Sequence, residues 1–274
     1  MYRARGKTSI YPMPQARRHT YHFLDYAKEF KAVYLDTEID MSVVKQRRAE
    51  STVTGERISY IVYLIEAISR ILQRYPEANA SVKHGLIPKM AVYSNVSAKF
   101  TMDKSIGESR VVLSGLIADS DQKSVEEMQK VINYYREREV NDITEFKGVR
   151  KLQSLPMWLG KIAYRLAMGN LESRDKLQGT FTITSLGHRP IQAFYPIISN
   201  TLCFGVGTIE DKPVAIARQI VIRPMMKLSL AFDHRAIDGA LAADILAEVK
   251  EFLEFDSSSI QKNNEEIEVS FIGS

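Results

Sequence analysis

The chain has 274 residues, of which 45% are hydrophobic and 26% charged, the balance of an ordinary folded globular protein. A net charge of only +4 and a single cysteine, Cys203, give no reason to expect a nucleic-acid partner and exclude an internal disulfide framework or a CxxC metal or redox motif. No apolar run approaches the roughly 18 residues of a membrane span and no signal peptide is evident, so we expect a soluble protein. Because the single cysteine suits a reducing compartment, we expect that protein in the cytoplasm.

The N-terminal segment is basic, and we expect residues 1–11 to form an arm that precedes the folded domain. Five basic residues come before the first acid, Asp25: Arg3, Arg5, Lys7, Arg17 and Arg18. Such an arm can attract an acidic partner or a phosphate, or it can be a solvated tail, and both readings stay open. His19 and His22 have a spacing that could share a metal, but no further Cys/His cluster joins them, so we expect no metal site.

The first half of the chain predicts alternating strands and helices. Residues 33–41 alternate apolar and polar side chains, which is typical of a half-buried strand. Apolar residues at three- and four-residue steps from Ile58 to Leu72 predict a helix that Pro76 stops. Two strand-like runs follow at 91–101 and 110–118, and Ser124 with Glu127 has the spacing of a capping box at the start of a second helix.

The second half predicts a helix, a series of strands and a last helix. Residues 154–170 are apolar and carry Pro156 near their first turn, where it suits a helix. Strands are expected at 179–185, 202–209, 213–222 and 225–233, and a helix at 239–254. The glycines of "GVGTIE" at Gly205 supply only the start of a dinucleotide fingerprint, and we interpret them as a strand end. The whole pattern predicts an α+β fold with one large mixed sheet flanked by helices.

His234 follows the last predicted strand and precedes Asp238 by four positions. Taken alone, His234 is a turn histidine satisfied by hydrogen bonds, and Asp238 is the N-cap of the last helix. Thr184, in "FTIT", is by itself an ordinary β-branched strand residue.

Three separated motifs together resemble a known family. They are "VVLSGLIADSDQKSVEEMQK" at 111–130, "GTFTITSLG" at 179–187 and "PMMKLSLAFDHRAIDG" at 224–239, and "YLIEAISRILQRYPEANA" resembles a fourth segment. The resemblance is to the catalytic domain of the dihydrolipoamide acyltransferases, the E2 components of 2-oxo acid dehydrogenase complexes, and spans residues 12–255. It implies the chloramphenicol acetyltransferase-like fold, a two-layer sandwich; Asp233 before His234 is typical of the E2 group rather than of chloramphenicol acetyltransferase.

The resemblance implies transfer of an acyl group between coenzyme A and a dihydrolipoyl thiol, without a covalent enzyme intermediate. His234 matches the general base, Thr184 the hydroxyl that stabilises the oxyanion, and Asp238 the acid that supports the site. In related enzymes an N-terminal arginine pairs with that acid, and Arg17 and Arg18 both lie in the corresponding region. The family builds its site between subunits of a trimer, so we expect a homotrimer.

The sequence also departs from the family pattern. No lipoyl domain and no peripheral-subunit-binding domain precede residue 12, so the acyl carrier is expected on another chain, as a lipoyl or a phosphopantetheine group. Residues 146–176 look like an added helical element that is structural or binds a carrier protein, and residues 256–274 form a polar tail. Two alternatives stay open: a free-standing acyltransferase that serves an acyl carrier protein or a biosynthetic acceptor, and a non-catalytic trimeric scaffold.

Overall fold

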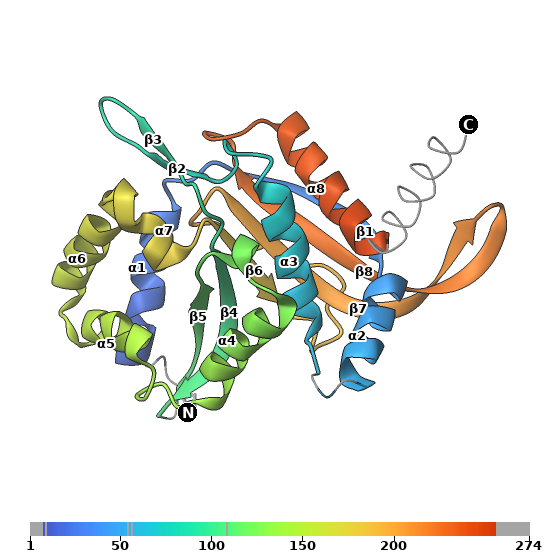
Figure 1. Ribbon diagram of the computed structural model, residues 1–274. Helices are drawn as coiled ribbons and strands as arrows, with labels where there is room; N and C mark the ends of the chain where they lie inside the picture. Colours follow the sequence, from blue (N-terminus) through green and yellow to red (C-terminus); the bar gives the residue numbers. More distant parts are fainter. Residues whose placement is uncertain (1–7, 9, 54, 56, 108, 256–274) are drawn as a thin grey trace.

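The computed structural model describes residues 8, 10–53, 55, 57–107 and 109–255. Its main feature is a six-stranded mixed sheet with the order β1-β8-β7-β6-β4-β5 (Figure 1). The strands of this sheet, in that order, are β1 (Ala32–Asp40), β8 (Gln219–Asp233), β7 (Leu202–Ile216), β6 (Phe181–Ser185), β4 (Ala98–Ile106) and β5 (Ser109–Ile117). β6 is parallel to β4 and to β7, and the other pairs are antiparallel. The α+β prediction with one mixed sheet is confirmed.

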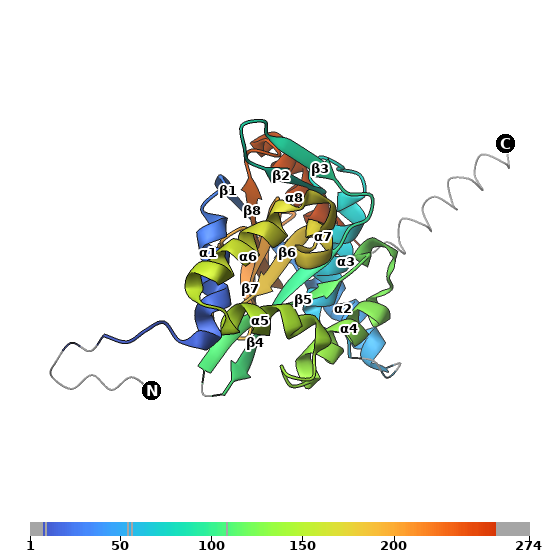
Figure 2. The ribbon, with the colours of Figure 1, turned by 90° about the vertical axis from the view of Figure 1, so that its left-hand side faces the viewer.

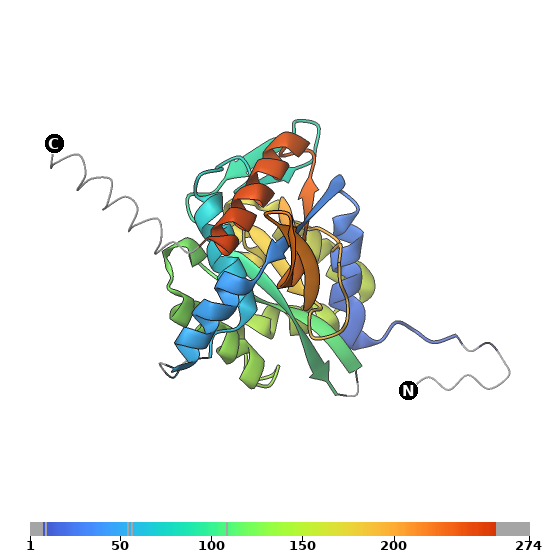
Figure 3. The same cartoon turned by 90° about the vertical axis from the view of Figure 1, so that its right-hand side faces the viewer.

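Helices lie on both faces of the sheet. One face carries α2 (Ser42–Val53), α3 (Tyr60–Leu72), α4 (Val125–Glu137) and α8 (Gly239–Glu254). On the other side, α1 (Arg18–Ala27) lies against the sheet, α5 (Lys147–Ser154) and α6 (Met157–Gly169) pack on α1, and α7 (Arg174–Gln178) lies next to α6 (Figure 2). Figure 3 shows α8 and α1 on opposite sides of the sheet. Short 3₁₀ helices span Gln15–Arg17 (η1), Ser120–Gln122 (η2), Thr144–Phe146 (η3) and Leu171–Ser173 (η4).

The most regular sequence patterns form the core. Helix α3 is buried along most of its length, and its stripe packs with the inner faces of β7 and β8 in one large apolar cluster. Burial of this kind is worth about 25 cal/mol per Å² of apolar area and is the main source of stability. The predicted capping box is present: the Glu127 amide donates to Ser124 Oγ (3.2 Å), and the Ser124 amide donates to Glu127 Oε2 (2.8 Å).

Two predicted strand regions were wrong in their extent. The run 91–101 is broken: β3 (Lys89–Val92) pairs with β2 (Ala80–Lys83) in a separate hairpin, and β4 begins only at Ala98. The three strands expected after residue 202 are two 15-residue strands, β7 and β8, joined at Ala217 and Arg218 with φ of 48° and 66°. A turn with two positive φ values normally uses Gly or Asn, so these residues gave no turn signal.

The sequence patterns also missed α2 and the β2–β3 hairpin. Helix α6 begins at Met157 with Pro156 as its N-cap residue, close to the prediction, whereas residues 147–154 form a further helix, α5. Most of the basic arm and all of the tail at 256–274 lie outside the described residues. Within the described part of the chain, no helix combines the length and apolarity needed to cross a membrane.

Candidate active site

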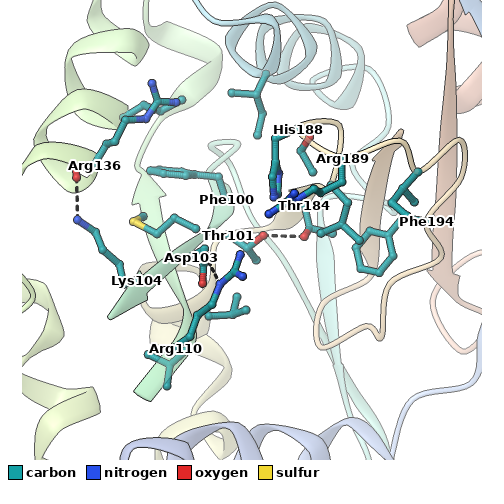
Figure 4. Close-up of a pocket in the computed structure, with 18 of the residues that line it drawn as sticks. Phe100, Thr101, Asp103, Lys104, Arg110, Arg136, Thr184, His188, Arg189 and Phe194 are labelled. Atoms are coloured by element: carbon teal, nitrogen blue, oxygen red, sulfur yellow. Dashed lines mark hydrogen bonds and ion pairs between the residues drawn. The ribbon is translucent and has the colours of Figure 1, made fainter. Parts of the chain in front are cut away.

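Thr184 lies near the end of β6, with its hydroxyl at the wall of a pocket (Figure 4). The hydroxyl of Thr101, on the neighbouring strand β4, donates a hydrogen bond of 2.6 Å to Thr184 Oγ1. Because a hydroxyl has one proton and two acceptor sites, this contact leaves the proton of Thr184 available to a group inside the pocket. Sequence reasoning missed Thr101, which carries no motif signal of its own.

The pocket has a volume of about 1100 Å³ and a strongly basic lining. Its described lining residues contribute five cationic side chains and one carboxylate: Arg17, Lys104, Arg110, Arg136, Arg189 and Asp103. The carboxylate of Asp103 is paired with Arg110 at 2.5 Å, and Lys104 Nζ donates to the carbonyl oxygen of Arg136 (2.7 Å). This imbalance creates a positive potential that attracts anionic ligands.

Two glycines of β7 let the loop after Thr184 pack against the sheet. A Cβ on Gly205 would lie 1.9 Å from the carbonyl oxygen of Phe194, and a Cβ on Gly207 would lie 2.0 Å from that of Gln192. Such approaches are impossible for any residue with a side chain. The interpretation of these glycines as a strand end was wrong, since they lie inside β7 and allow the 188–194 loop to form the pocket wall.

His234 follows β8 in a turn, as predicted. Its backbone amide donates to the carbonyl of Lys31 (2.9 Å), and its ring lies 5.7 Å from the ring of Phe232. The Nδ1 atom is 3.3 Å from Asp238 Oδ1, and the side chain is 45% exposed. With Nδ1 facing this carboxylate, Nε2 is the nitrogen left for a ligand.

A buried carboxylate fixes the backbone around His234. Asp233 is 1% exposed and forms a bidentate contact with Arg235, with a shortest distance of 2.7 Å. Asp233 Oδ1 also accepts hydrogen bonds from the amides of Lys31 and Arg235. Since these groups flank the histidine on both sides, Asp233 is a positioning residue. In the sequence analysis, Asp233 only distinguished the E2 group from chloramphenicol acetyltransferase.

Asp238 occupies the N-cap position of α8, but its side chain makes no cap hydrogen bond and is 88% exposed. Of the two candidate arginines, Arg18 donates to the carbonyls of Gln153 (3.2 Å) and Leu155 (2.9 Å), and Arg17 lines the pocket. The carboxylate of Asp238 therefore lies beside His234, and within the described residues it is paired with neither Arg17 nor Arg18.

Thr184 and His234 lie far apart in one chain. Thr184 is level with Gly205 on β7, which is level with Ser229 on β8. His234 comes five residues after Ser229, toward the opposite end of the strands, because β8 runs antiparallel to β6. Five residues span about 17 Å along a strand and two strand spacings about 10 Å across it, so the two backbones are about 20 Å apart. One chain does not bring the two residues together.

The two N-terminal histidines, His19 and His22, contact other groups of the protein. His19 contacts the carbonyl of Val112 (3.2 Å) and the amide of Gln153 (3.0 Å), and His22 packs directly against Gly160. Desolvation by burial lowers the pKa of both rings. A search of the described residues finds no group of three metal-ligating side chains.

A row of polar residues crosses the sheet beneath α1. Lys99, Thr182 and Cys203 lie side by side on β4, β6 and β7. Lys99 Nζ is 3.3 Å from Ser199 Oγ and 5.9 Å from the centre of the Phe23 ring on α1. Desolvation lowers the pKa of Lys99 to about 8 and raises that of Cys203 to about 12, so the thiol stays protonated and is a poor nucleophile.

Comparison with known proteins identifies the family. The family described as 2-oxoacid dehydrogenases acyltransferase (catalytic domain) matches residues 5–151 and 149–260. The chain belongs to this family. Three solved structures establish the fold. A probable dihydrolipoamide acetyltransferase from Listeria monocytogenes 4b F2365 has a TM-score of 0.67 and is 22% identical, and the cubic core of the pyruvate dehydrogenase multienzyme complex has a TM-score of 0.69 and is 23% identical. A truncated catalytic core of the 2-oxoacid dehydrogenase multienzyme complex from Thermoplasma acidophilum has a TM-score of 0.67 and is 21% identical. Their matches cover 90–91% of this chain and 92–98% of the other chains.

Curated relatives are longer than this chain. A dihydrolipoyllysine-residue succinyltransferase component of the 2-oxoglutarate dehydrogenase complex from Haemophilus influenzae is 28% identical over 261 residues, which are 92% of this chain and 55% of the relative. A dihydrolipoyllysine-residue acetyltransferase component of the pyruvate dehydrogenase complex from Staphylococcus epidermidis is 26% identical over 230 residues, which are 81% of this chain and 45% of the relative. The chain thus spans about half the length of these relatives.

We expect Thr101→Val to lower kcat while KM for the thioester changes little. Without the hydrogen bond from Thr101, the hydroxyl of Thr184 is no longer fixed toward the pocket, whereas Thr184→Val removes the donor itself. The loss for Thr101→Val is expected to be about tenfold, smaller than the roughly hundred- to thousandfold loss typical of a missing oxyanion donor. Steady-state kinetics of both variants measure this, and Thr101→Ser is the matched control that restores the bond. An unchanged kcat in Thr101→Val would contradict the positioning role.

Lys99→Met should change how stability depends on pH. In the unfolded chain the Lys99 pKa returns to about 10.5, so between about pH 8 and 10.5 the unfolded state binds a proton that the folded state has released. Stability from this group therefore rises as pH rises through that window, and the methionine variant loses this rise. Urea unfolding at pH 7.5 and 9.5 measures it, with Lys45→Met on exposed α2 as control. Equal pH responses in wild type and Lys99→Met would show that Lys99 is not desolvated.

Proposed function

We propose that this chain transfers an acyl group between coenzyme A and a dihydrolipoyl thiol carried on a partner chain. The curated relatives it resembles are named for transfer to a dihydrolipoyllysine residue, with succinyl and acetyl as the acyl groups. The basic pocket at Thr184 is suited to a substrate such as coenzyme A, which carries several phosphate charges. Because the chain has a single cysteine, which suits a reducing compartment, we propose that the reaction takes place in the cytoplasm.

The observation that carries this proposal is the separation of Thr184 and His234 across one sheet. A general base and an oxyanion donor must both lie within about 3 Å of the reacting atoms. Because about 20 Å separates their backbones in one chain, the complete site is proposed to form where Thr184 of one subunit meets His234 of the next. A head-to-tail contact of this kind can close into a ring, and the resemblance to the E2 family implies three subunits, so we propose a homotrimer.

The proposed reaction needs one proton carrier and one hydroxyl donor. The Nε2 atom of His234 takes the proton of the attacking thiol, and the sulfur forms a bond to the thioester carbonyl carbon. The carbonyl oxygen becomes an oxyanion that accepts a hydrogen bond from Thr184. When the intermediate collapses, the bond to the other sulfur breaks, and the leaving thiolate takes the proton from the imidazolium. A thiol with a pKa of about 8.5 is mostly protonated at neutral pH, so the base is required.

Asp238 and Asp233 support this step without exchanging a proton. Asp238 lies against Nδ1 and favours the tautomer in which that nitrogen carries the hydrogen, which leaves Nε2 unprotonated. Asp233 holds the backbone on either side of the histidine through Lys31 and Arg235. Together they fix the position and orientation of the proposed base.

Acyl transfer measured by mass spectrometry, from a panel of acyl-coenzyme A esters to dihydrolipoamide and to an acyl carrier protein, tests the proposal. Wild type is expected to acylate dihydrolipoamide, and His234→Ala should reduce the rate by about 10²- to 10⁴-fold, the usual contribution of a general base. His84→Ala, at an exposed position between β2 and β3, is the matched control.

Each other result rejects the proposal in favour of a specific alternative. Transfer confined to the carrier protein would indicate a free-standing biosynthetic acyltransferase. Transfer that survives in His234→Ala would show that the base assignment is wrong. No transfer to either acceptor by wild type would favour a trimeric scaffold.

A further inference from the structure

An apolar surface lies on the outside of the helical region next to the pocket. Helix α6 exposes Trp158 (66%), Ile162 (50%) and Leu166 (72%), which recur every four residues and therefore lie along one side of the helix. Helix α1 exposes Tyr21 (49%) and Leu24 (38%). We call these five residues the outer helical surface; Figure 2 shows α6 facing outward beside α1.

The opposite side of α6 is firmly packed, so the outer side chains are held in place. Gly160 lies directly against the His22 ring, and the ring of Tyr164 is 5.9 Å from that of Tyr26. Asp25 of α1 binds Lys161 (3.0 Å) and Arg165 (3.3 Å) of α6. A large aromatic and two aliphatic side chains thus remain exposed on a rigid helix, which is typical of a binding surface.

Helices α5 and α6 themselves carry only positive charges, although Lys161 and Arg165 are paired with Asp25 of α1. Residues 147–169, which form α5 and α6, contain five basic residues and no acid: Lys147, Arg150, Lys151, Lys161 and Arg165. Among the described residues, no carboxylate lies within ion-pair distance of Lys147 or Lys151, and both are exposed. An acidic partner is complementary to such a surface and would be guided to it over long range.

Helix α1 connects the outer helical surface to the pocket. Arg17 and Thr20 line the pocket that holds Thr184, and Tyr21, the next residue, belongs to the outer surface. Arg18 joins the same region to α5 and α6 through the carbonyls of Gln153 and Leu155. A partner seated on the outer helical surface therefore contacts the same helix that lines the pocket.

We propose that the outer helical surface docks an acidic lipoyl domain, whose dihydrolipoyl-lysine arm then enters the pocket at Thr184. This inference rests on the proposed function and adds where the carrier binds. The contact is small: five exposed side chains compare with about 20–30 residues per side in a standard stable interface. A carrier must leave after each turnover, so a small contact suits it, whereas a second copy of the chain would need a larger one.

Kinetics with two acceptors test the docking separately from the chemistry. The acceptors are free dihydrolipoamide and a recombinant lipoyl domain with an acidic surface, its lipoyl group reduced to the dithiol. Trp158→Ser and the pair Lys147→Glu with Lys151→Glu should each raise KM for the domain about tenfold, while KM and kcat for dihydrolipoamide stay unchanged. The matched controls on α2 are Val53→Ser, at an 88% exposed position, and Lys45→Glu.

The outcomes separate the two proposals. If wild type does not acylate dihydrolipoamide, the proposed function fails. If it does, but the surface variants use the lipoyl domain as well as wild type, the docking proposal is overturned while the function stands. Three further results would assign the surface to a different partner and also overturn the docking proposal. They are a loss of activity that is selective for an acyl carrier protein, binding to anionic phospholipid vesicles by wild type but not by Trp158→Ser, and a smaller oligomer for Trp158→Ser.

Discussion

The antiparallel pairing of β8 with β7 is the constraint on which the site depends. It directs the chain from Ser229 toward one end of the strands, whereas β6, parallel to β7, carries Thr184 toward the other end. Backbone hydrogen bonds fix this register, and a slip of one residue would turn every core side chain of the strand to the wrong face. The separation of Thr184 from His234 is therefore a property of the fold and does not depend on side-chain rotamers.

Both halves of the proposed site are supported by groups that do not react. Asp233 is almost fully buried, yet its charge is balanced by Arg235 and by two backbone amides, which is the condition under which a buried carboxylate is tolerated. On the other side, the glycines of β7 admit the loop that closes the pocket around Thr184. Catalytic geometry must be accurate to a fraction of an ångström, so such supporting contacts matter as much as the reacting groups.

The sequence predicted the elements whose patterns reflect burial, and it missed those that depend on contacts distant along the chain. The stripe of α3 and the Ser124 capping box follow from local rules, and both are present. The predicted strands at 202–209, 213–222 and 225–233 break β7 and β8 in the wrong places, because the turn between them is made by Ala217 and Arg218, which are unusual at positive φ.

The site shows the same limit. Thr184 and His234 were found through motifs, but Thr101 was not, because its role depends on the pairing of β4 with β6, which no local pattern encodes. The prediction that Asp238 is the N-cap residue of α8 is confirmed, but its carboxylate makes no capping hydrogen bond and lies beside His234. The assignment of the three catalytic residues remains a prediction.

Subunit complementation tests the central claim, that each site takes His234 from one chain and Thr184 from its neighbour, most directly. His234→Ala and Thr184→Val are each nearly inactive alone, but when equal amounts assemble at random, about one site in four combines an intact histidine with an intact threonine. The account predicts recovery of about a quarter of wild-type activity in the mixed oligomers. A mixture no more active than the separate variants would contradict it, because a site contained within one chain cannot be restored by mixing.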